Sequence, residues 1–399
     1  MRSRLDVLDG MRGFAIFLVV LYHETSLTGF RLEWPPWPAA PIVSFQWLGA
    51  TGFVGVELFF FISGFCLFYP YARHVVEGAR IPTLREFAYR RFIKIVPSYV
   101  LALTVLAFVN RNDFPNGFEL AQAYLAHLFF VHPWWIPTFY SISGPFWTLG
   151  VEVQFYVLFP LIAAAFMRSP VLSWLVLSAV AVGYRSYILA AGLGNFTFYD
   201  DQLTGVIDLF ATGMLGAYLY VRWRHPLERA RVVPAVATAL AVVAILWGAQ
   251  LLRALYASNA ILPQFGMYLW LMQHRSALAL DCLAFALAAS FSIGGFRETV
   301  ANPFLVWLSV ISYNLYLWHD GVIVRCREHG FPCALTPEPW KYLHDWEWRF
   351  LFGSLAISLA VASAVTYLLE RPLLKLRPAW AVQPSSRGPT PADASAAPL

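Results

Sequence analysis

Residues 12 to 24, RGFAIFLVVLYHE, combine an apolar run with three groups that could perform chemistry: Arg12, His23 and Glu24. The eleven-residue step from Arg12 to His23 closes to within about 20° of three helical turns. A helix would therefore present both side chains on one face, roughly 16 Å apart along its axis. A guanidinium binds phosphate through paired hydrogen bonds, and a neutral imidazole can accept a proton from a hydroxyl. The spacing predicts an internal path with an anion site at one end and a base deeper inside.

Ionisable side chains also interrupt other apolar segments. Glu57 lies in GVELFFFISGF, Glu152 lies in FWTLGVEVQFY, and His319 and Asp320 end SYNLYLWHD. Each alone could be a polar link between helices, and in the first segment the cation could be an interfacial anchor and the histidine a satisfied core residue. Together, these groups require a polar, water-accessible interior.

The composition places these segments in a membrane. Hydrophobic residues make up 59% of the 399 residues, charged residues only 13%, and the mean hydropathy is +0.58. Charged residues alone reach about a quarter of a soluble domain, so a soluble protein is excluded. The net charge of +5 is spread over many short segments and forms no basic groove, so nucleic acid is not an expected partner.

The predicted fold is all-α, a polytopic transmembrane helical bundle. A span needs roughly 20 apolar residues, and hydropathy predicts about ten spans. Most Lys and Arg residues fall in segments that place the N- and C-termini in the cytoplasm. Arg185 falls within a span, and Arg275 in a segment expected outside. The predicted spans lie near residues 11–29, 52–72, 93–110, 145–167, 170–192, 203–221, 232–252, 276–295, 303–324 and 350–370.

The rest of the chain adds few constraints. Residues 1–378 form the expected membrane domain, and residues 379–399, rich in Pro, Ser and Ala, are expected to form a disordered cytoplasmic tail. We find no internal repeat of the kind that many transporters contain. Cys326 and Cys333 could form a disulfide in an oxidising compartment. No Cys and His spacing indicates zinc, so no metal is expected.

The chain resembles the integral-membrane acyltransferase-3 family. The resemblance rests on LDGMRGFAIFLVVLYHE, GVELFFFISGF, RRFIKIVPSY, FWTLGVEVQFYVLFPL, SYNLYLWH and ERPLLK, which occur in the family's order between residue 8 and about residue 375. Each motif alone is weak, but the ordered set is specific. The family implies about ten helices and transfer of an acyl group, usually acetyl, from cytoplasmic acyl-CoA to a hydroxyl of a sugar or other acceptor. The implied location is the bacterial inner membrane.

Four matches to the family's motifs imply site residues. The Arg and His of the family's first helix match Arg12 and His23, and its third-span basic pair matches Arg90 and Arg91. With Arg12, this pair would bind the phosphates of the donor, acyl-CoA, and no permanently bound cofactor is implied. The pair could instead be a juxtamembrane cluster that attracts anionic lipid.

The family's fourth-span Glu matches Glu152, whereas Val153 stands where the family usually has a second Glu, and Glu57 stands where it has an Asp. A longer side chain leaves the role of Glu57 open. Glu57, His319 and Trp147 are our candidates for contact with the substrate.

In the expected reaction His23 is the general base, because an imidazole pKa near 6.5 suits proton abstraction from a hydroxyl. A carboxylate would fix its tautomer. Glu24 is adjacent in sequence but points about 100° away, so Glu152 on another helix is at least as good a candidate. His23 could also carry the acyl group covalently.

The expected acceptor is a carbohydrate or glycosylated molecule. The alternative function is a transporter or flippase that uses the buried charges as a proton or substrate path. The sequence leaves open the acceptor's identity, the acyl length and the oligomeric state.

Overall fold

The computed structural model describes residues 6–30, 32–34, 43–262, 265–332 and 344–376. A bundle of long helices accounts for most of them. In chain order the elements are α1 (Asp6–Thr28), β1 (Glu33–Trp34), β2 (Val43–Ser44), α2 (Gln46–Ala50), η1 (Gly52–Val54), α3 (Gly55–Glu77), α4 (Leu84–Val109), η2 (Arg111–Asp113), α5 (Gly117–Leu128), η3 (His132–Trp134), α6 (Ile136–Phe139), η4 (Gly144–Phe146), α7 (Trp147–Arg168), α8 (Pro170–Ala191), α9 (Phe196–Asp200), α10 (Leu203–Arg229), α11 (Val233–Ile261), α12 (Gly266–Phe291), α13 (Gly294–Val300), α14 (Pro303–Glu328), α15 (His344–Val365), η6 (Thr366–Glu370) and α16 (Arg371–Lys375).

The prediction of an all-α polytopic membrane bundle is confirmed. Each predicted span corresponds to a long helix, and in the described part of the chain eight helices are long and apolar enough to cross a membrane. The other two predicted spans, α1 and α12, are similarly long, and their charged side chains lower their hydropathy. The prediction was wrong at the start of α12, which begins at Gly266 and not near residue 276. Arg275 therefore lies inside this helix.

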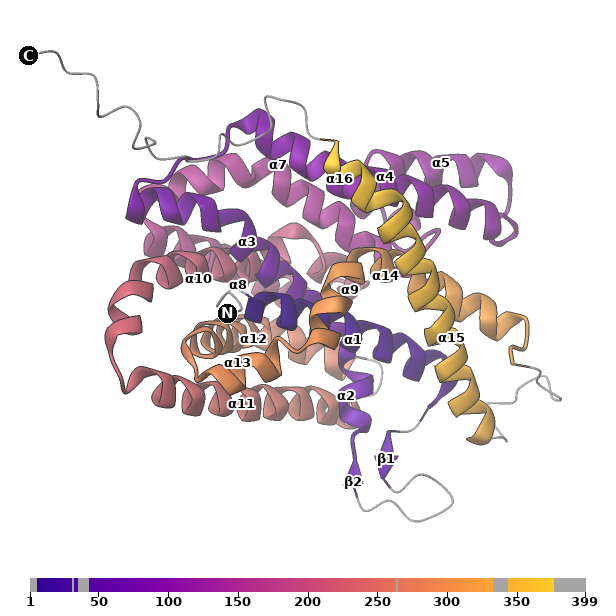
Figure 1. Ribbon diagram of the computed structural model, residues 1–399. Helices are drawn as coiled ribbons and strands as arrows, with labels where there is room; N and C mark the ends of the chain where they lie inside the picture. Colours follow the sequence, from indigo (N-terminus) through magenta and orange to yellow (C-terminus); the bar gives the residue numbers. More distant parts are fainter. Residues whose placement is uncertain (1–5, 31, 35–42, 263–264, 333–343, 377–399) are drawn as a thin grey trace, which may run out of the picture.

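Several helices pack against partners that are far apart in sequence, whereas α11 packs against the next helix, α12. α1 packs mainly against α14, and α3 packs mainly against α10. In Figure 1, α1 lies near the middle of the bundle and α15 crosses its surface over α14. The sequence did not predict the short antiparallel pair of β1 and β2. Cys333 and residues 379–399 lie outside the described residues, so the expectations about a disulfide and a tail stay untested.

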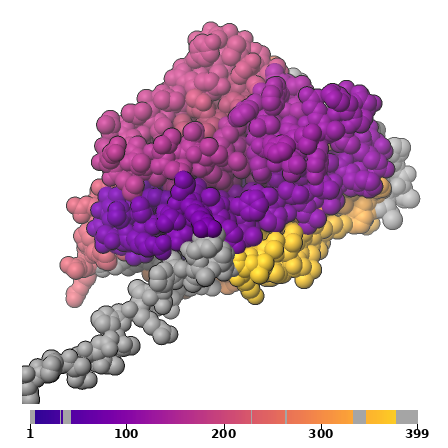
Figure 2. Space-filling view, turned by 90° about the horizontal axis from the view of Figure 1, so that it is seen from above, coloured from indigo at the N-terminus to yellow at the C-terminus, as the bar shows by residue number. Residues whose placement is uncertain are grey.

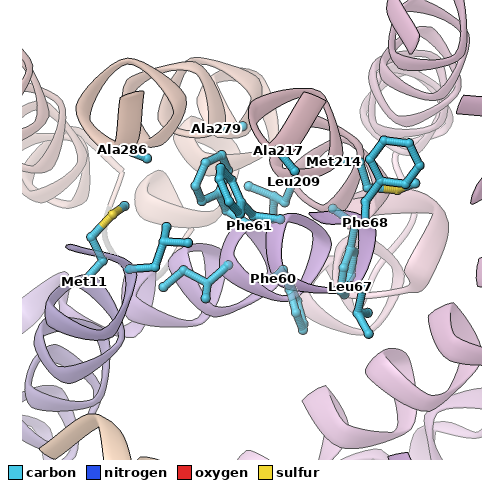
Figure 3. Packing of buried hydrophobic residues seen from close by; sticks show 14 of the residues in the cluster. Met11, Phe60, Phe61, Leu67, Phe68, Leu209, Met214, Ala217, Ala279 and Ala286 are labelled. Carbon is cyan, nitrogen blue, oxygen red and sulfur yellow. The ribbon is translucent and has the colours of Figure 1, made fainter. Parts of the chain in front are cut away.

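The core around α3 is dominated by aromatic rings. Phe61 and Phe68 are fully buried, and Figure 3 shows them beside Leu209, Met214 and Ala217 of α10. Because lipid is as apolar as these side chains, close packing rather than exclusion of water holds such helices together. The core therefore depends on how closely α3 and α10 approach.

Two glycines set that approach. A Cβ added at Gly64 would lie 2.1 Å from the carbonyl oxygen of Phe210, and one at Gly213 would lie 2.0 Å from that of Phe61. Such contacts leave room only for hydrogen, so the backbones of α3 and α10 touch. Small residues at a helix–helix contact allow this close approach in membrane proteins.

Replacing Gly64 with alanine is expected to lower the free energy of unfolding by about 1–3 kcal/mol, because the added methyl group must push two backbones apart. Gly183, within α8, is the matched control, since a Cβ there meets nothing within 4 Å. Gly183→Ala should be neutral or slightly stabilising. Thermal unfolding of both variants in nanodiscs measures the difference, and equal stabilities would contradict close packing at Gly64.

Candidate functional site

A cavity of about 410 Å³ opens among α1, α3, α4, α7 and α14. Four cations and one carboxylate line it, and we call it the cationic pocket. The charged residues are Arg12, Arg90, Arg91, Lys94 and Glu152. The structure thus brings together the candidate phosphate-binding residues and one of the candidate catalytic carboxylates. Sequence reasoning did not select Lys94, although it lies in the quoted stretch RRFIKIVPSY.

The start of α4 is fixed by a capping box. The Thr83 hydroxyl accepts from the Glu86 backbone N–H, and the Glu86 carboxylate accepts from the Thr83 backbone N–H. This arrangement satisfies amides that the first helical turn leaves without partners. The basic residues follow in the next two turns, so their backbone positions are set by a rigid helix end.

The Arg91 side chain is held against the pocket wall. Its guanidinium lies 5.9 Å from the centre of the Tyr156 ring, and the Tyr156 hydroxyl donates to Glu152. The Ser63 hydroxyl donates to the same carboxylate oxygen of Glu152 at 2.6 Å. Arg91 Nε is buried and has no hydrogen-bond partner among the described residues. A buried donor of this kind is costly unless a ligand binds to it.

Lys94 is anchored by the C-terminal part of the bundle. Its ammonium donates to Glu370, which is buried at the end of the π-helical η6 and also accepts from the Asn314 amide. The Tyr89 hydroxyl donates to the backbone oxygen of Leu376, and Figure 2 shows this C-terminal segment, in yellow, on the surface beside the N-terminal helices. The ERPLLK stretch thus positions a pocket cation.

His23 and His319 meet where α1 packs against α14. Nε2 of His319 lies 3.2 Å from Nδ1 of His23, and the rings meet edge to face with centroids 4.7 Å apart. Nδ1 of His319 lies 2.9 Å from the carbonyl oxygen of Tyr316, and Nδ1 of His23 lies 2.9 Å from that of Val19. Carbonyl oxygens only accept, so both Nδ1 atoms carry protons. The lone pair of a base is therefore on Nε2 of His23, which is half-buried.

This histidine pair continues the wall of the cationic pocket. Ser312 and Tyr316 line the pocket, and His319 follows them on the same face of α14, seven and three residues further along. His319 is fully buried. The pair thus lies one helical turn beyond the lining of the pocket.

The structure differs from the expectation that a carboxylate holds His23. Glu24 points toward α15, where the Ser354 hydroxyl donates to it at 2.6 Å, and Glu152 bonds to Ser63 and Tyr156. His319 instead occupies the position beside Nδ1 of His23. The spacing of residues along the chain could not reveal which helix would supply the neighbour of His23.

Glu57 lies in a separate buried cluster. Its carboxylate is 3.0 Å from Nε of Arg275, whose other nitrogens lie 2.9 Å from Asp200 and 3.1 Å from Asp201. The Arg275 side chain is 1% exposed. The cluster joins α3, α12 and the turn before α10, and it indicates a structural role for Glu57. Sequence reasoning missed it because Arg275 was expected outside the membrane.

Trp147, the remaining substrate candidate, packs among aromatic rings. It stacks on Phe139 with centroids 5.7 Å apart and meets Phe60 edge to face. It begins α7, immediately before Thr148 in the pocket wall. These aromatic contacts therefore stabilise the N-terminal end of α7.

Two stacked imidazole rings lie beside the N-terminal end of α7. The rings of His127 and His132 are parallel, with centroids 4.0 Å apart, and Nε2 of His132 lies 3.0 Å from the carbonyl oxygen of Phe146. Burial lowers the pKa of His127 to about 3 and that of His132 to about 4. Both rings are therefore neutral at pH 7, and His132 donates to Phe146 at the end of η4.

The fold and these sites define a polytopic α-helical membrane protein with a charged internal cavity beside a histidine pair. Residues 5–369 match the family model described as "Acyltransferase domain", and the chain belongs to that family, acyltransferase-3. The predicted resemblance is confirmed.

Two curated relatives of the chain come from Staphylococcus aureus. "O-acetyltransferase OatA" of strain NCTC 8325 / PS 47 is 25% identical over 338 residues, which cover 80% of this chain and 51% of that protein. The protein SACOL0978 of strain COL is 24% identical over 335 residues, with coverage of 79% and 50%. The chain spans about half the length of these curated relatives. No solved structure matches the chain.

Proposed function

We propose that this protein is a membrane O-acetyltransferase that moves an acetyl group from cytoplasmic acetyl-CoA to a hydroxyl of a carbohydrate or glycosylated acceptor. The proposed location is the bacterial inner membrane, with both termini and the cationic pocket on the cytoplasmic side. The family and the names of the relatives support the acyltransferase chemistry. The single observation that carries the donor assignment is the cluster of four cations in one cavity.

The cationic pocket suits the phosphates of CoA. Guanidinium groups bind phosphate oxygens through two parallel hydrogen bonds, and Arg91 has a buried Nε that lacks a partner among the described residues. Arg12 and His23 lie eleven residues apart on α1, or about 16 Å along the helix. That distance is of the order of an extended pantetheine arm, so the nucleotide can stay in the pocket while the thioester reaches His23.

In the proposed reaction, Nε2 of His23 takes the proton of the acceptor hydroxyl as its oxygen attacks the thioester carbonyl carbon. A C–O bond forms, the C–S bond breaks, and the departing CoA sulfur takes the proton from His23. His319 keeps the proton of His23 on Nδ1 and thereby keeps the lone pair on Nε2.

A covalent route uses the same lone pair. In that route, Nε2 of His23 attacks the thioester first, and the acetyl group then passes from the imidazole to the acceptor. Label from radioactive acetyl-CoA that stays on the protein distinguishes this route from direct transfer.

Arg91→Ala is expected to weaken acetyl-CoA binding about 10- to 100-fold, because one charge-assisted phosphate contact contributes about 1.5–3 kcal/mol. The measurement is equilibrium binding of radiolabelled acetyl-CoA to membranes with matched expression. Lys375→Ala is the control, since Lys375 is exposed on α16 and lies outside the lining of the pocket. Unchanged binding by Arg91→Ala, or equal losses in both variants, would remove the support for a donor site here.

A further inference from the structure

A second cavity, of about 460 Å³, lies at the far ends of α4 and α14. We call it the acidic pocket, because its ionisable side chains are Asp113, Glu119, Asp320 and the phenol of Tyr140. Amide and hydroxyl groups of Asn110, Gln122 and neighbouring Ser and Thr residues complete its polar lining, and no Lys, Arg or His among the described residues contributes to it. Its volume falls within the range of small-molecule sites.

The acidic and cationic pockets are neighbours along two helices. On α14, Tyr316 lines the cationic pocket and Asp320 lines the acidic pocket, a separation of about 6 Å along the helix. Near the start of α7, Thr148 lines the first and Gly144 the second. The Thr148 hydroxyl donates to the Tyr316 hydroxyl at 2.9 Å, so this pair joins α7 to α14 on the wall of the cationic pocket.

The histidine pair occupies this boundary. His319 lies between Tyr316 and Asp320 in sequence, and its Nε2 touches His23. Neither histidine of the pair is among the described residues that line the acidic pocket, but Asp320 directly follows His319 on α14. The pocket therefore lies next to the helical segment that carries the histidine beside the proposed base.

The charges of the two pockets are opposite. Four cations face one carboxylate in the cationic pocket, whereas three carboxylates line the acidic pocket. Outside the lining, Arg325 lies 3.4 Å from Asp113 and also pairs with Glu328, so it offsets only part of this charge. A ligand whose charge has the same sign as the pocket lining is repelled. A cleft lined by charges of one sign concentrates ligands of the opposite charge.

We propose that the acidic pocket binds the acceptor and selects polyhydroxyl molecules that carry no anionic group, whether neutral or amino-bearing. This inference rests on the proposed function and specifies its second substrate. Carboxylates and amide oxygens accept from sugar hydroxyls, and they repel uronic acids and phosphates.

The test uses three radiolabelled disaccharides of similar size: neutral diacetylchitobiose, cationic chitobiose and an anionic hyaluronan disaccharide. Their binding is measured with the full chain in nanodiscs. The variants are Asp320→Asn, Glu119→Gln and the pair combined, and Glu33→Gln on β1 is the control for the loss of one negative charge outside the pocket. Asp320→Lys provides a charge reversal.

We expect the neutral and cationic disaccharides to bind at least about tenfold more tightly than the anionic one. The combined variant should reduce this discrimination to within about threefold, Asp320→Lys should favour the anionic disaccharide, and Glu33→Gln should match wild type. Equal or tighter wild-type binding of the anionic disaccharide, or absence of binding by all three, overturns the inference.

Binding of radiolabelled acetyl-CoA to the same preparations separates the two proposals. If acetyl-CoA binds and the disaccharides show no preference by charge, the acceptor inference alone fails. If the disaccharides bind as expected and acetyl-CoA does not, the acidic pocket stands as a saccharide site and the proposed acyltransferase function fails.

Discussion

Replacing His23 with alanine is expected to slow acetyl transfer about 10²- to 10⁴-fold, the usual contribution of a positioned general base. Binding of acetyl-CoA should change little, because His23 lies outside the lining of the cationic pocket. The measurement scores label from radioactive acetyl-CoA on extracted glycan and on the protein, with expression matched. His329→Ala is the control, since His329 is an exposed imidazole at the end of α14.

The neighbouring histidine gives a second measure of the same mechanism. His319 acts through His23, so His319→Gln, whose side chain can still pair with Nδ1 of His23, should retain more activity than His319→Ala. The alanine variant should also shift the pH profile of the rate, because the imidazole of His23 loses the neighbour beside its Nδ1. A purely structural role would lower the amount of folded protein and leave the pH profile unchanged.

The outcomes for His23→Ala are separable. Loss of glycan label with acetyl-CoA still bound supports the assignment of the base. Protein label that is present in wild type and absent in the variant supports the covalent route. An acetyl-transfer rate of His23→Ala within about threefold of wild type would contradict the assignment of His23 as the general base. Another residue would then have to be the base.

Arg275→Met is expected to cost about 3–5 kcal/mol of folding free energy, because it leaves Glu57, Asp200 and Asp201 buried together without their shared cation. The measurement is the thermal unfolding midpoint in nanodiscs, together with the yield of folded protein. Arg253→Met is the matched control, since the exposed Arg253 on α11 lies over the Trp47 ring and forms no such cluster with the described residues.

A compensating variant tests the cause. Adding Glu57→Gln and Asp201→Asn to Arg275→Met removes two of the three stranded charges, so the triple variant should recover part of the lost stability. An Arg275→Met protein as stable as Arg253→Met would show that the cluster tolerates unpaired carboxylates. No recovery in the triple variant would point to lost packing around α12 and away from charge.

The sequence alone determined the membrane class, the helical fold and the family. Apolar runs of sufficient length can satisfy their backbone hydrogen bonds in lipid only as helices, so composition and hydropathy predict the spans. The shared face of Arg12 and His23 was also predictable, because the helical repeat is local. The start of α12 was predicted about ten residues too late, because Arg275 and neighbouring polar residues lower the hydropathy of the first part of this helix.

Which of these helices meet follows from tertiary packing and could not be predicted from the sequence. The partner of His23 is His319, 296 residues away, and the partner of Glu57 is Arg275, 218 residues away. The cationic pocket draws its wall from α1, α3, α4, α7, α14 and α16, and the acidic pocket joins the end of α4 to α14. Periodicity fixes the face that a residue occupies on its own helix. Which faces then come together depends on close packing, as at Gly64 and Gly213, and the spacing of residues along the chain does not record that choice.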